Sequence, residues 1–420
     1  MNLPSSTFSL SNIDDLHNSR PGDRFIRNRA TLQDIETAYK FSPKRRTSTS
    51  IEKKNNENDM YGNILKINLK KNKKLPTVSN FSIFDPPQIE MPDNSRLRER
   101  QINKTPYKIL DAPNLMDDFY VNVIDWSINH NLAVGLGNTT YLWNFFTNEV
   151  EKVFEFDFSN LMTSLGWDFR SETLALGSLS GQVNIFDPVK RKSIEIFHDH
   201  HERVGAISLF GNMLITGSRD QKICMRDLRD YKKPIVEYKE HLQEVCGLKW
   251  SPDGSYFASG GNDNCLYIYS PKTQHPLMKK THKAAVRAIS WSERHLGLLA
   301  TGAGTADRCI RLWDINQRKL LDIRDTGSQI CNIAFSKRDD ELITTHGFSQ
   351  NDICIWKRKG LRKTHSLIGH TSRVLHLAQS PCGHYIVSGA GDETLRFWNL
   401  GYSKPDRVGK RSTLDVAVLR

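Results

Sequence analysis

The chain has 420 residues, of which 38% are hydrophobic and 25% are charged. This length exceeds the need of one small core, and the start of the chain is too polar to be globular, so we expect one large domain plus a tail. No stretch approaches the roughly 18 apolar residues of a membrane span, and the first residues lack the order of a secretory signal, so we expect a soluble intracellular protein. The seven cysteines form no Cys-x-x-Cys pair, which disfavours structural zinc and a disulfide framework.

Residues 1–103 are more basic than the rest of the chain. They hold 18 lysines and arginines against 12 aspartates and glutamates, so they carry half of the net charge of +12. The basic runs Lys44–Arg46 and Lys70–Lys74 lack the interleaved aromatic residues that stack on nucleic-acid bases. This composition predicts a disordered basic N-terminal arm and argues against nucleic acid as its partner.

Seven short segments recur after residue 110, each with alternating apolar residues around one key position. They read YLWN, NIFD, CMRD, YIYS, RLWD, CIWK and RFWN, with key positions Trp143, Phe186, Arg226, Tyr269, Trp313, Trp356 and Trp398. Successive key positions lie 40 to 44 residues apart, which is the period of a four-stranded propeller blade. Upstream apolar runs such as VGAISLF and LITGS suit strands buried between neighbouring blades. The repeats therefore predict an all-β fold, a seven-bladed WD-repeat β-propeller.

The last blade lacks an outer strand of its own. After Trp398 the chain soon continues as Gly401-Tyr402-Ser403-Lys404-Pro405, which is a poor strand sequence. The segment Lys104–Leu110, directly before the first blade, is the natural donor of the missing strand. We therefore expect three parts: a disordered arm over 1–103, a propeller over 104–400 and a C-terminal tail over 401–420.

Four carboxylates share one place in the repeat. Each stands six residues before the key position of its blade, and they are Asp220, Asp263, Asp307 and Asp392. Because aspartate side chains accept hydrogen bonds from nearby backbone N–H groups, we interpret all four as stabilising a turn.

No segment has the spacing of a catalytic or metal centre. The group His198-Asp199-His200-His201 is dense in possible ligands, but its spacing matches no zinc signature, and we expect a solvated loop there. The sequence holds no Walker loop, no Gly-x-Ser-x-Gly and no His-Glu-x-x-His motif. We therefore expect no catalytic residue, no metal and no cofactor, and we interpret the protein as a binding module rather than an enzyme.

Strand direction predicts which loops share a face of the propeller. If the strands of a blade alternate in direction, the loop entering its first strand and the loop between its second and third strands open on the same side. Six polar residues fall on such loops by their offsets from the key positions: Asp118, Asn262, Asn264, Thr305, Gln329 and Arg373. We call these six residues the polar face. Periodicity alone makes it a polar rim, because loop residues are commonly polar.

Several segments resemble the Fizzy and Fizzy-related family, the activator subunits of the anaphase-promoting complex, which is a ubiquitin ligase. They are KILDAPNLMDDFYVNVIDW (108–126), HLQEVCGLKWSPDGSYFASGGNDN (241–264), ATGAGTADRCIRLWDI (300–315), SQICNIAFS (328–336), HGFSQNDICIWK (346–357) and GHTSRVLHLAQSPCG (369–383). The resemblance spans residues 104–400 almost continuously and includes loops that generic blades do not share. It implies that the ligase supplies catalysis and that this chain supplies substrate choice.

Short motifs at both ends of the chain extend the resemblance. Residues 22–29, GDRFIRNR, resemble the family's C-box, with Arg27 where proline is usual. Residues 63–66, NILK, resemble the second docking motif Lys-Ile-Leu-Arg, and the final Leu-Arg is similar to the family's Ile-Arg terminus. The resemblance assigns ligase docking to Asp23, Arg24, Phe25, Ile26, Arg29, Ile64, Leu65, Leu419 and Arg420.

The resemblance also implies two sites for degrons, the short motifs that mark substrates for the ligase. Recognition of the KEN box, Lys-Glu-Asn, carries over to the polar face. There Asp118 would pair with the lysine and Arg373 with the glutamate, while amides such as that of Asn262 would bond the asparagine and the backbone. Recognition of the destruction box carries over to Asp111 and Glu393, which would hold the degron's arginine where the first and last blades join.

These observations predict a substrate-recruiting co-activator of the anaphase-promoting complex. The expected partners are ligase subunits and degron-bearing substrates such as cyclins and securin, and the expected location is the nucleus and the cytoplasm; neither membrane nor nucleic acid is an expected partner. The short arm and altered C-box resemble the meiosis-specific branch of the family.

Two alternatives stay open. A degron-binding inhibitor that does not activate would fit the departure at Arg27, and a basic scaffold for nucleic acid or chromatin would fit the net charge of +12.

Overall fold

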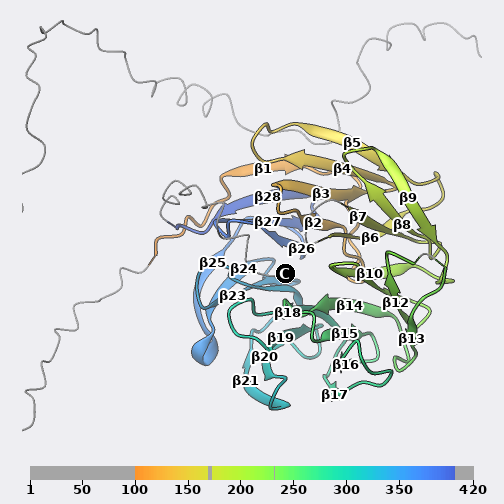
Figure 1. Cartoon of the computed structure of the whole chain (residues 1–420). Helices are drawn as coiled ribbons and strands as arrows, with labels where there is room; N and C mark the ends of the chain where they lie inside the picture. Colours follow the sequence, from red (N-terminus) through yellow and green to blue (C-terminus); the bar gives the residue numbers. More distant parts are fainter. Residues whose placement is uncertain (1–99, 169–172, 231, 403–420) are drawn as a thin grey trace, which may run out of the picture. The chain divides into compact units, whose positions relative to one another are not determined.

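The computed structural model describes residues 100–168, 173–230 and 232–402. Within them, 28 strands form seven four-stranded sheets that are arranged as the blades of a ring (Figure 1). The segments outside these ranges include residues 1–99 of the predicted arm and residues 403–420 of the predicted C-terminal tail. The expected all-β, seven-bladed propeller is confirmed.

Each blade is an antiparallel sheet whose first strand lies at the centre of the ring. Blades 1 to 3 contain β2 (Ile124–Trp126), β3 (Asn131–Leu136), β4 (Thr139–Asn144) and β5 (Val150–Glu155); β6 (Met162–Trp167), β7 (Leu174–Ser178), β8 (Val183–Asp187) and β9 (Lys192–Phe197); β10 (Val204–Phe210), β11 (Met213–Ser218), β12 (Ile223–Asp227) and β13 (Val236–Tyr238). The key positions Trp143, Phe186 and Arg226 lie on the third strands, as the repeat predicts.

Blades 4 to 7 repeat this order, with one short helix between two strands of blade 6. They contain β14 (Val245–Trp250), β15 (Phe257–Gly261), β16 (Cys265–Tyr269) and β17 (Met278–Thr281); β18 (Val286–Trp291), β19 (Leu298–Ala303), β20 (Cys309–Asp314) and β21 (Lys319–Asp325); β22 (Ile330–Phe335), β23 (Glu341–His346), β24 (Ile353–Lys357), the 3₁₀ helix η1 (Lys359–Leu361) and β25 (Arg362–Leu367); β26 (Val374–Gln379), β27 (Tyr385–Ala390), β28 (Thr394–Asn399) and β1 (Lys108–Asp111). No helix among the described residues has the length and apolar character that crossing a bilayer requires.

The ring closes because the strand before the first blade completes the seventh. In Figure 1 the orange β1 lies beside the blue β28. The two strands are antiparallel, with Lys108 opposite Phe397 and Asp111 opposite Thr394. The predicted donor segment is therefore confirmed, although the paired strand begins at Lys108 rather than Lys104.

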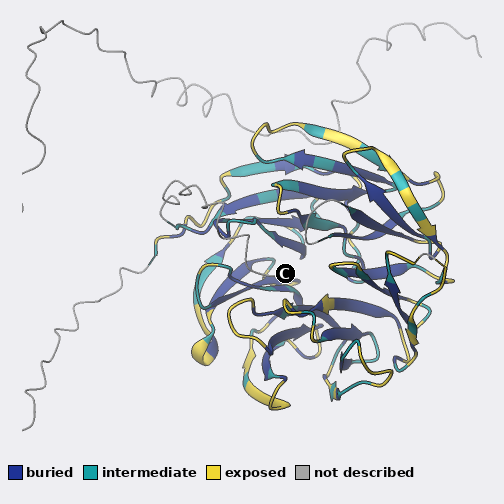
Figure 2. Ribbon diagram, viewed as in Figure 1, coloured by how far each residue is buried: buried dark blue, intermediate teal, exposed yellow. Residues whose placement is uncertain are grey.

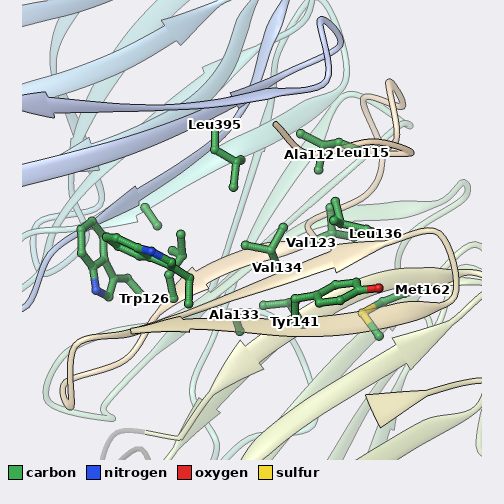
Figure 3. Close-up of a cluster of buried hydrophobic side chains, with 14 of the residues drawn as sticks. Ala112, Leu115, Val123, Trp126, Ala133, Val134, Leu136, Tyr141, Met162 and Leu395 are labelled. Carbon is green, nitrogen blue, oxygen red and sulfur yellow. The ribbon is translucent and has the colours of Figure 1, made fainter. Parts of the chain in front are cut away.

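The hydrophobic core lies between neighbouring blades. Figure 2 shows buried inner strands and exposed outer ones, and β21 is exposed along most of its length. Figure 3 shows one such cluster, in which Leu395 of blade 7 and Met162 of blade 2 flank Val134 of blade 1. Because neighbouring blades cover both faces of each sheet, strands such as β7 and β8 are buried along their whole length rather than on alternate residues.

The predicted turn carboxylates take part in buried hydrogen-bond networks. In blade 7, Asp392 accepts a bond from the backbone N–H of Thr394 at 3.1 Å, and His370 links it to Ser388 at 2.8 Å. Trp398, the key residue of the blade, donates its indole N–H to the same Ser388 at 2.9 Å. Asp220 and Asp263 have matching partners in blades 3 and 4.

One of these networks has a different partner, and one loop corrects a sequence-based expectation. Asp307 accepts a hydrogen bond from the backbone N–H of Lys283, as Asp392 does from that of Thr371. It binds the guanidinium of Arg311 at 2.8 Å, however, where the other three carboxylates bind a histidine. The loop at His198 is not wholly solvated, because His200 is 3% exposed and bridges Asp220 and Thr216. His200 thus occupies the place that His370 takes in blade 7.

We expect the stability of the propeller to fall between about pH 6.5 and pH 4. Burial, with the nearby charge of Arg311, lowers the pKa of His282 to about 4, and burial lowers the pKa of His346 to about 4. Above pH 6.5 both rings are neutral in the folded and unfolded states. As the pH falls, the unfolded chain takes up protons that the folded chain excludes, so each histidine costs up to about 1.4 kcal/mol per pH unit.

Denaturant unfolding of the full chain at pH 7.5 and at pH 5 measures this loss. His282→Gln keeps a donor for Thr301, which His282 contacts at 3.1 Å, but cannot titrate. This variant should lose less stability between the two pH values than the wild type. Equal losses in both proteins would contradict the assignment to His282.

Candidate functional site

The six residues of the polar face lie on loops at one end of the ring. Asp118 lies between β1 and β2, and Gln329 and Arg373 directly precede β22 and β26. Asn262 and Asn264 lie between β15 and β16, and Thr305 lies between β19 and β20. Because neighbouring strands are antiparallel, both kinds of loop open on the same side of the propeller. The structure thus brings all six to one face, as strand direction predicts.

Asp118 is held by an arginine that the sequence analysis did not single out. Arg203 donates to Asp118 at 2.6 Å and to both carboxylate oxygens of Glu244 at 2.7 and 2.9 Å. The backbone N–H of Tyr120 donates to the other Asp118 oxygen at 2.8 Å. One guanidinium between two carboxylates leaves a net charge of −1, so this end of the face still attracts a cation.

The environment of Arg203 keeps its positive charge in place. Burial alone would lower the pKa of the guanidinium, but the hydrogen bond and charge of Glu244, followed by those of Asp118, raise it above its ordinary value. Glu244 stands 25 residues before its key position, Tyr269, which is the same offset as that of Asp118 and Arg373. This shared offset is the signal that could have identified Glu244.

Arg373 carries the opposite charge on the same face. Its Nε donates to a carboxylate oxygen of Asp117 at 2.7 Å, and Nη2 donates to the backbone carbonyl of Asp117 at 2.7 Å. The guanidinium also lies 5.9 Å from the ring centre of Phe348, whose side chain is 61% exposed. Arg373 is therefore oriented in advance beside an apolar surface, and an anion can bind to its remaining donors.

The amides of the polar face are partly fixed by their neighbours. The hydroxyl of Tyr120 donates to the carbonyl oxygen of Asn262 at 2.8 Å, and the amide nitrogen of Asn262 donates to Gln243 at 2.7 Å. A Cβ atom at position 347 would lie only 2.7 Å from the side-chain oxygen of Gln329. The glycine at position 347 therefore leaves room for the Gln329 amide. Thr305 is exposed. Together these groups offer neutral donors and acceptors on the same face as Asp118 and Arg373.

The closing strand pair places the two destruction-box candidates next to each other. Asp111 is the last residue of β1 and is paired with Thr394, the residue after Glu393. The backbone N–H of Ala112 donates to the carbonyl of Glu393 at 2.8 Å. Glu393 is exposed and has a φ of 55° in the turn that enters β28. The structure therefore brings the backbones of two acidic residues together from the two ends of the repeat array.

The docking candidates lie outside the described residues. These are Asp23, Arg24, Phe25, Ile26, Arg29, Ile64, Leu65, Leu419 and Arg420. Their roles stay predictions.

One buried group in the described part of the chain has metal-like composition: His346, Asp352 and Cys354 place their ligand atoms within 4.8 Å of one another. The cluster is part of a hydrogen-bond network, since His346 bonds Thr344 at 2.8 Å and Asp352 accepts bonds from Ser366 and from Lys363. The ammonium of Lys363 lies 3.3 Å from the Asp352 carboxylate, where it opposes binding of a cation. We interpret the cluster as a structural network of blade 6.

A family model described as the CDC20/Fizzy WD40 domain matches residues 110–398. The chain is 47% identical over 316 residues to Protein FIZZY-RELATED 1 of Arabidopsis thaliana, a match that covers 75% of this chain and 66% of that protein. It is 42% identical over 327 residues to Meiotic fizzy-related protein 1 of Schizosaccharomyces pombe, covering 78% of each.

Two further matches concern proteins of larger assemblies. The chain is 41% identical over 358 residues to Anaphase-promoting complex subunit cdh1 of Dictyostelium discoideum, covering 76% of this chain and 47% of that protein. A chain in the crystal structure of the Mitotic Checkpoint Complex is similar with a TM-score of 0.70 and 36% identity, covering 77% of this chain and 99% of that one. The chain spans about two thirds of the length of the plant relatives that it matches.

Proposed function

Since this chain belongs to the CDC20/Fizzy family, whose WD40 domain matches residues 110–398, we propose that it recruits substrates to the anaphase-promoting complex as a co-activator. One observation carries the proposal: Asp118 and Arg373, opposite in charge, lie on the same face as the amides of Asn262 and its neighbours. This arrangement suits a short peptide that presents a cation, an anion and an amide. The chain supplies substrate choice, and the ligase performs the chemistry.

A Lys-Glu-Asn peptide is complementary to the polar face. Its lysine pairs with the carboxylate of Asp118, where the charges of Asp118 and Glu244 together outnumber that of Arg203 by one. Its glutamate binds the guanidinium of Arg373, and its asparagine exchanges hydrogen bonds with Asn262 and its neighbours. Because the protein side chains are already oriented by their own hydrogen bonds, little conformational entropy is lost on binding.

The destruction box binds at the join of blades 7 and 1. A guanidinium presents donors on two sides, and acceptors come from Asp111 at the end of β1 and from Glu393 in the turn before β28. The two degron sites use different residues, so one substrate that carries both motifs can occupy both. Cyclins and securin are substrates of the expected kind. Nuclear and cytoplasmic location and a role in meiosis remain parts of the same proposal.

We expect Arg24→Ala combined with deletion of Arg420 to abolish association with the ligase. The Arg24 side chain and the C-terminal Leu-Arg pair fill separate pockets of a large partner, and losing two tethered weak contacts removes their combined gain in avidity. Co-purification of ligase subunits from dividing and meiotic cells measures the association. Binding of a Lys-Glu-Asn peptide serves as the control, because both changes lie outside the propeller. Unchanged co-purification of the double variant would overturn the co-activator proposal.

A degron-binding inhibitor is a second candidate because Arg27 replaces the proline that is usual in the C-box. An inhibitor would bind both degron peptides but would lower ubiquitin transfer when added to the ligase with a bound activator. A co-activator would raise transfer when added to the ligase alone. Reconstitution with purified components separates the two.

A further inference from the structure

The innermost strands of six blades share one irregularity. In β6, β10, β14, β18, β22 and β26 the pairing with the next strand skips the second residue. The skipped residues are Thr163, Gly205, Cys246, Arg287, Cys331 and Leu375. A bulge of this kind redirects the local backbone and side chain away from the regular ladder.

Arg287 uses this position to reach across the ring. Its side chain is 4% exposed, and it donates to the backbone carbonyls of Cys331 at 2.8 Å, Leu375 at 2.6 Å and Val121 at 2.7 Å. These carbonyls belong to blade 6, blade 7 and the segment that enters blade 1. The guanidinium also lies 5.5 Å from the ring centre of Phe119. The side chain of Arg287, from blade 5, therefore connects blade 6, blade 7 and the segment that enters blade 1.

Asn122 makes the complementary set of contacts from blade 1. Its side-chain amide donates to the carbonyls of Gly205 at 2.9 Å and Cys246 at 3.2 Å, in blades 3 and 4. Its backbone N–H donates to Thr163 of blade 2 at 3.0 Å. Arg287 of blade 5 and Asn122, in the segment that enters blade 1, together thus contact the five other blades. We call these two residues the axial hub.

The axial hub lies directly behind the loop that carries Asp118. Phe119 is 6% exposed and packs in a cluster with Ala285, Cys331 and Leu375 of blades 5 to 7. Tyr120, the next residue, donates its hydroxyl to Asn262 of blade 4 at 2.8 Å. Residues 119–122, which follow Asp118, are therefore all held by contacts with other blades. The orientation of the Asp118 side chain thus depends on the axial hub.

We propose that Arg287 and Tyr120 are positioning residues for recognition of the Lys-Glu-Asn degron. They hold the segment Phe119–Asn122 across the axis, and this sets Asp118 in register with Asn262 on the polar face. The inference rests on the proposed degron function. Arg287 is buried and does not touch the peptide, so its contribution to affinity passes through the segment that it holds.

The test compares Arg287→Met, Arg287→Lys and Tyr120→Phe in the full chain. A Lys-Glu-Asn peptide and a destruction-box peptide are titrated in parallel, and hydrogen exchange is measured at the amides of residues 119–123. Arg287→Met should weaken the Lys-Glu-Asn peptide at least about 10-fold and speed exchange of these amides. Arg287→Lys, which keeps a charged donor, should recover part of both. The destruction-box affinity should change less than about 2-fold, because the hydrogen bonds of Arg287 and Asn122 described above go to residues other than Asp111 and Glu393.

Tyr120→Phe removes one hydroxyl and keeps the ring, so it tests the positioning even if Arg287→Met does not fold. It should weaken the Lys-Glu-Asn peptide about 3- to 10-fold with an unchanged melting temperature. Unchanged affinity in Tyr120→Phe, or equal losses for both peptides in the folded Arg287 variants, would overturn the inference. If the wild type binds neither peptide, the proposed function fails, and exchange at residues 119–123 still decides whether Arg287 holds the segment.

Discussion

Replacing Arg373 by alanine is expected to weaken binding of a Lys-Glu-Asn peptide by about 1.5–3 kcal/mol, the usual range for a charge-assisted hydrogen bond. Two effects add in the same direction. The peptide glutamate loses its cationic partner, and Asp117, which Arg373 binds through two hydrogen bonds, is left as an uncompensated negative charge beside it. We therefore expect a loss toward the upper end of this range.

The stability of the Arg373→Ala variant should change little, because the side chain lies at the surface and is 24% exposed. Arg324→Ala is a matched control, since Arg324 is an exposed arginine on the outer strand β21. Titration calorimetry of both variants measures the effect. If a Lys-Glu-Asn peptide and an Ala-Ala-Ala control bind the wild type equally, the polar face has another ligand.

Reversing the charge of Glu393 is expected to give the second large effect. Glu393→Ala leaves Asp111 able to pair with the degron's arginine, so we expect binding to weaken but to persist. Glu393→Arg places a like charge against that arginine, and this should cost at least about 1 kcal/mol more than the alanine change in a partly screened groove. Neither variant should alter binding of a Lys-Glu-Asn peptide, because the polar face lies on other loops.

Glu237→Arg is the control for a change of two charge units, since Glu237 lies on the outer strand β13 of blade 3. Parallel titrations with a destruction-box peptide and a Lys-Glu-Asn peptide separate local from global effects. Losses for both ligands in Glu393→Arg would mean one shared site or general damage. That result would contradict the assignment of two sites.

The sequence was sufficient to predict the architecture because the repeat is local. Each key position, such as Trp398, lies on a third strand whose neighbours are close in the chain, so its spacing reveals the blade. Ring closure was predictable for a related reason, since the seventh blade lacked one strand and one unassigned segment remained. Strand alternation then placed residues as distant as Asp118 and Arg373 on one face.

The contacts between blades could not be predicted, because they join residues with no fixed separation in the chain. Arg203 binds Asp118, which is 85 positions away in the sequence, and Arg287 binds Val121, which is 166 positions away. An arginine in a loop or an inner strand has no sequence pattern that distinguishes these roles from a solvated charge. His200 was misjudged for a similar reason: its cluster looked like a polar loop, while the partner that buries it, Asp220, lies in another turn.

Reconstituted ubiquitin transfer is the most direct test of the central claim. The ligase without a bound activator is mixed with a substrate that carries both degrons, and this chain is added. We predict transfer that requires the chain, falls when either degron is mutated, and falls again with Arg373→Ala. Transfer that does not change when the chain is added, or that is indifferent to both degrons, would contradict the account.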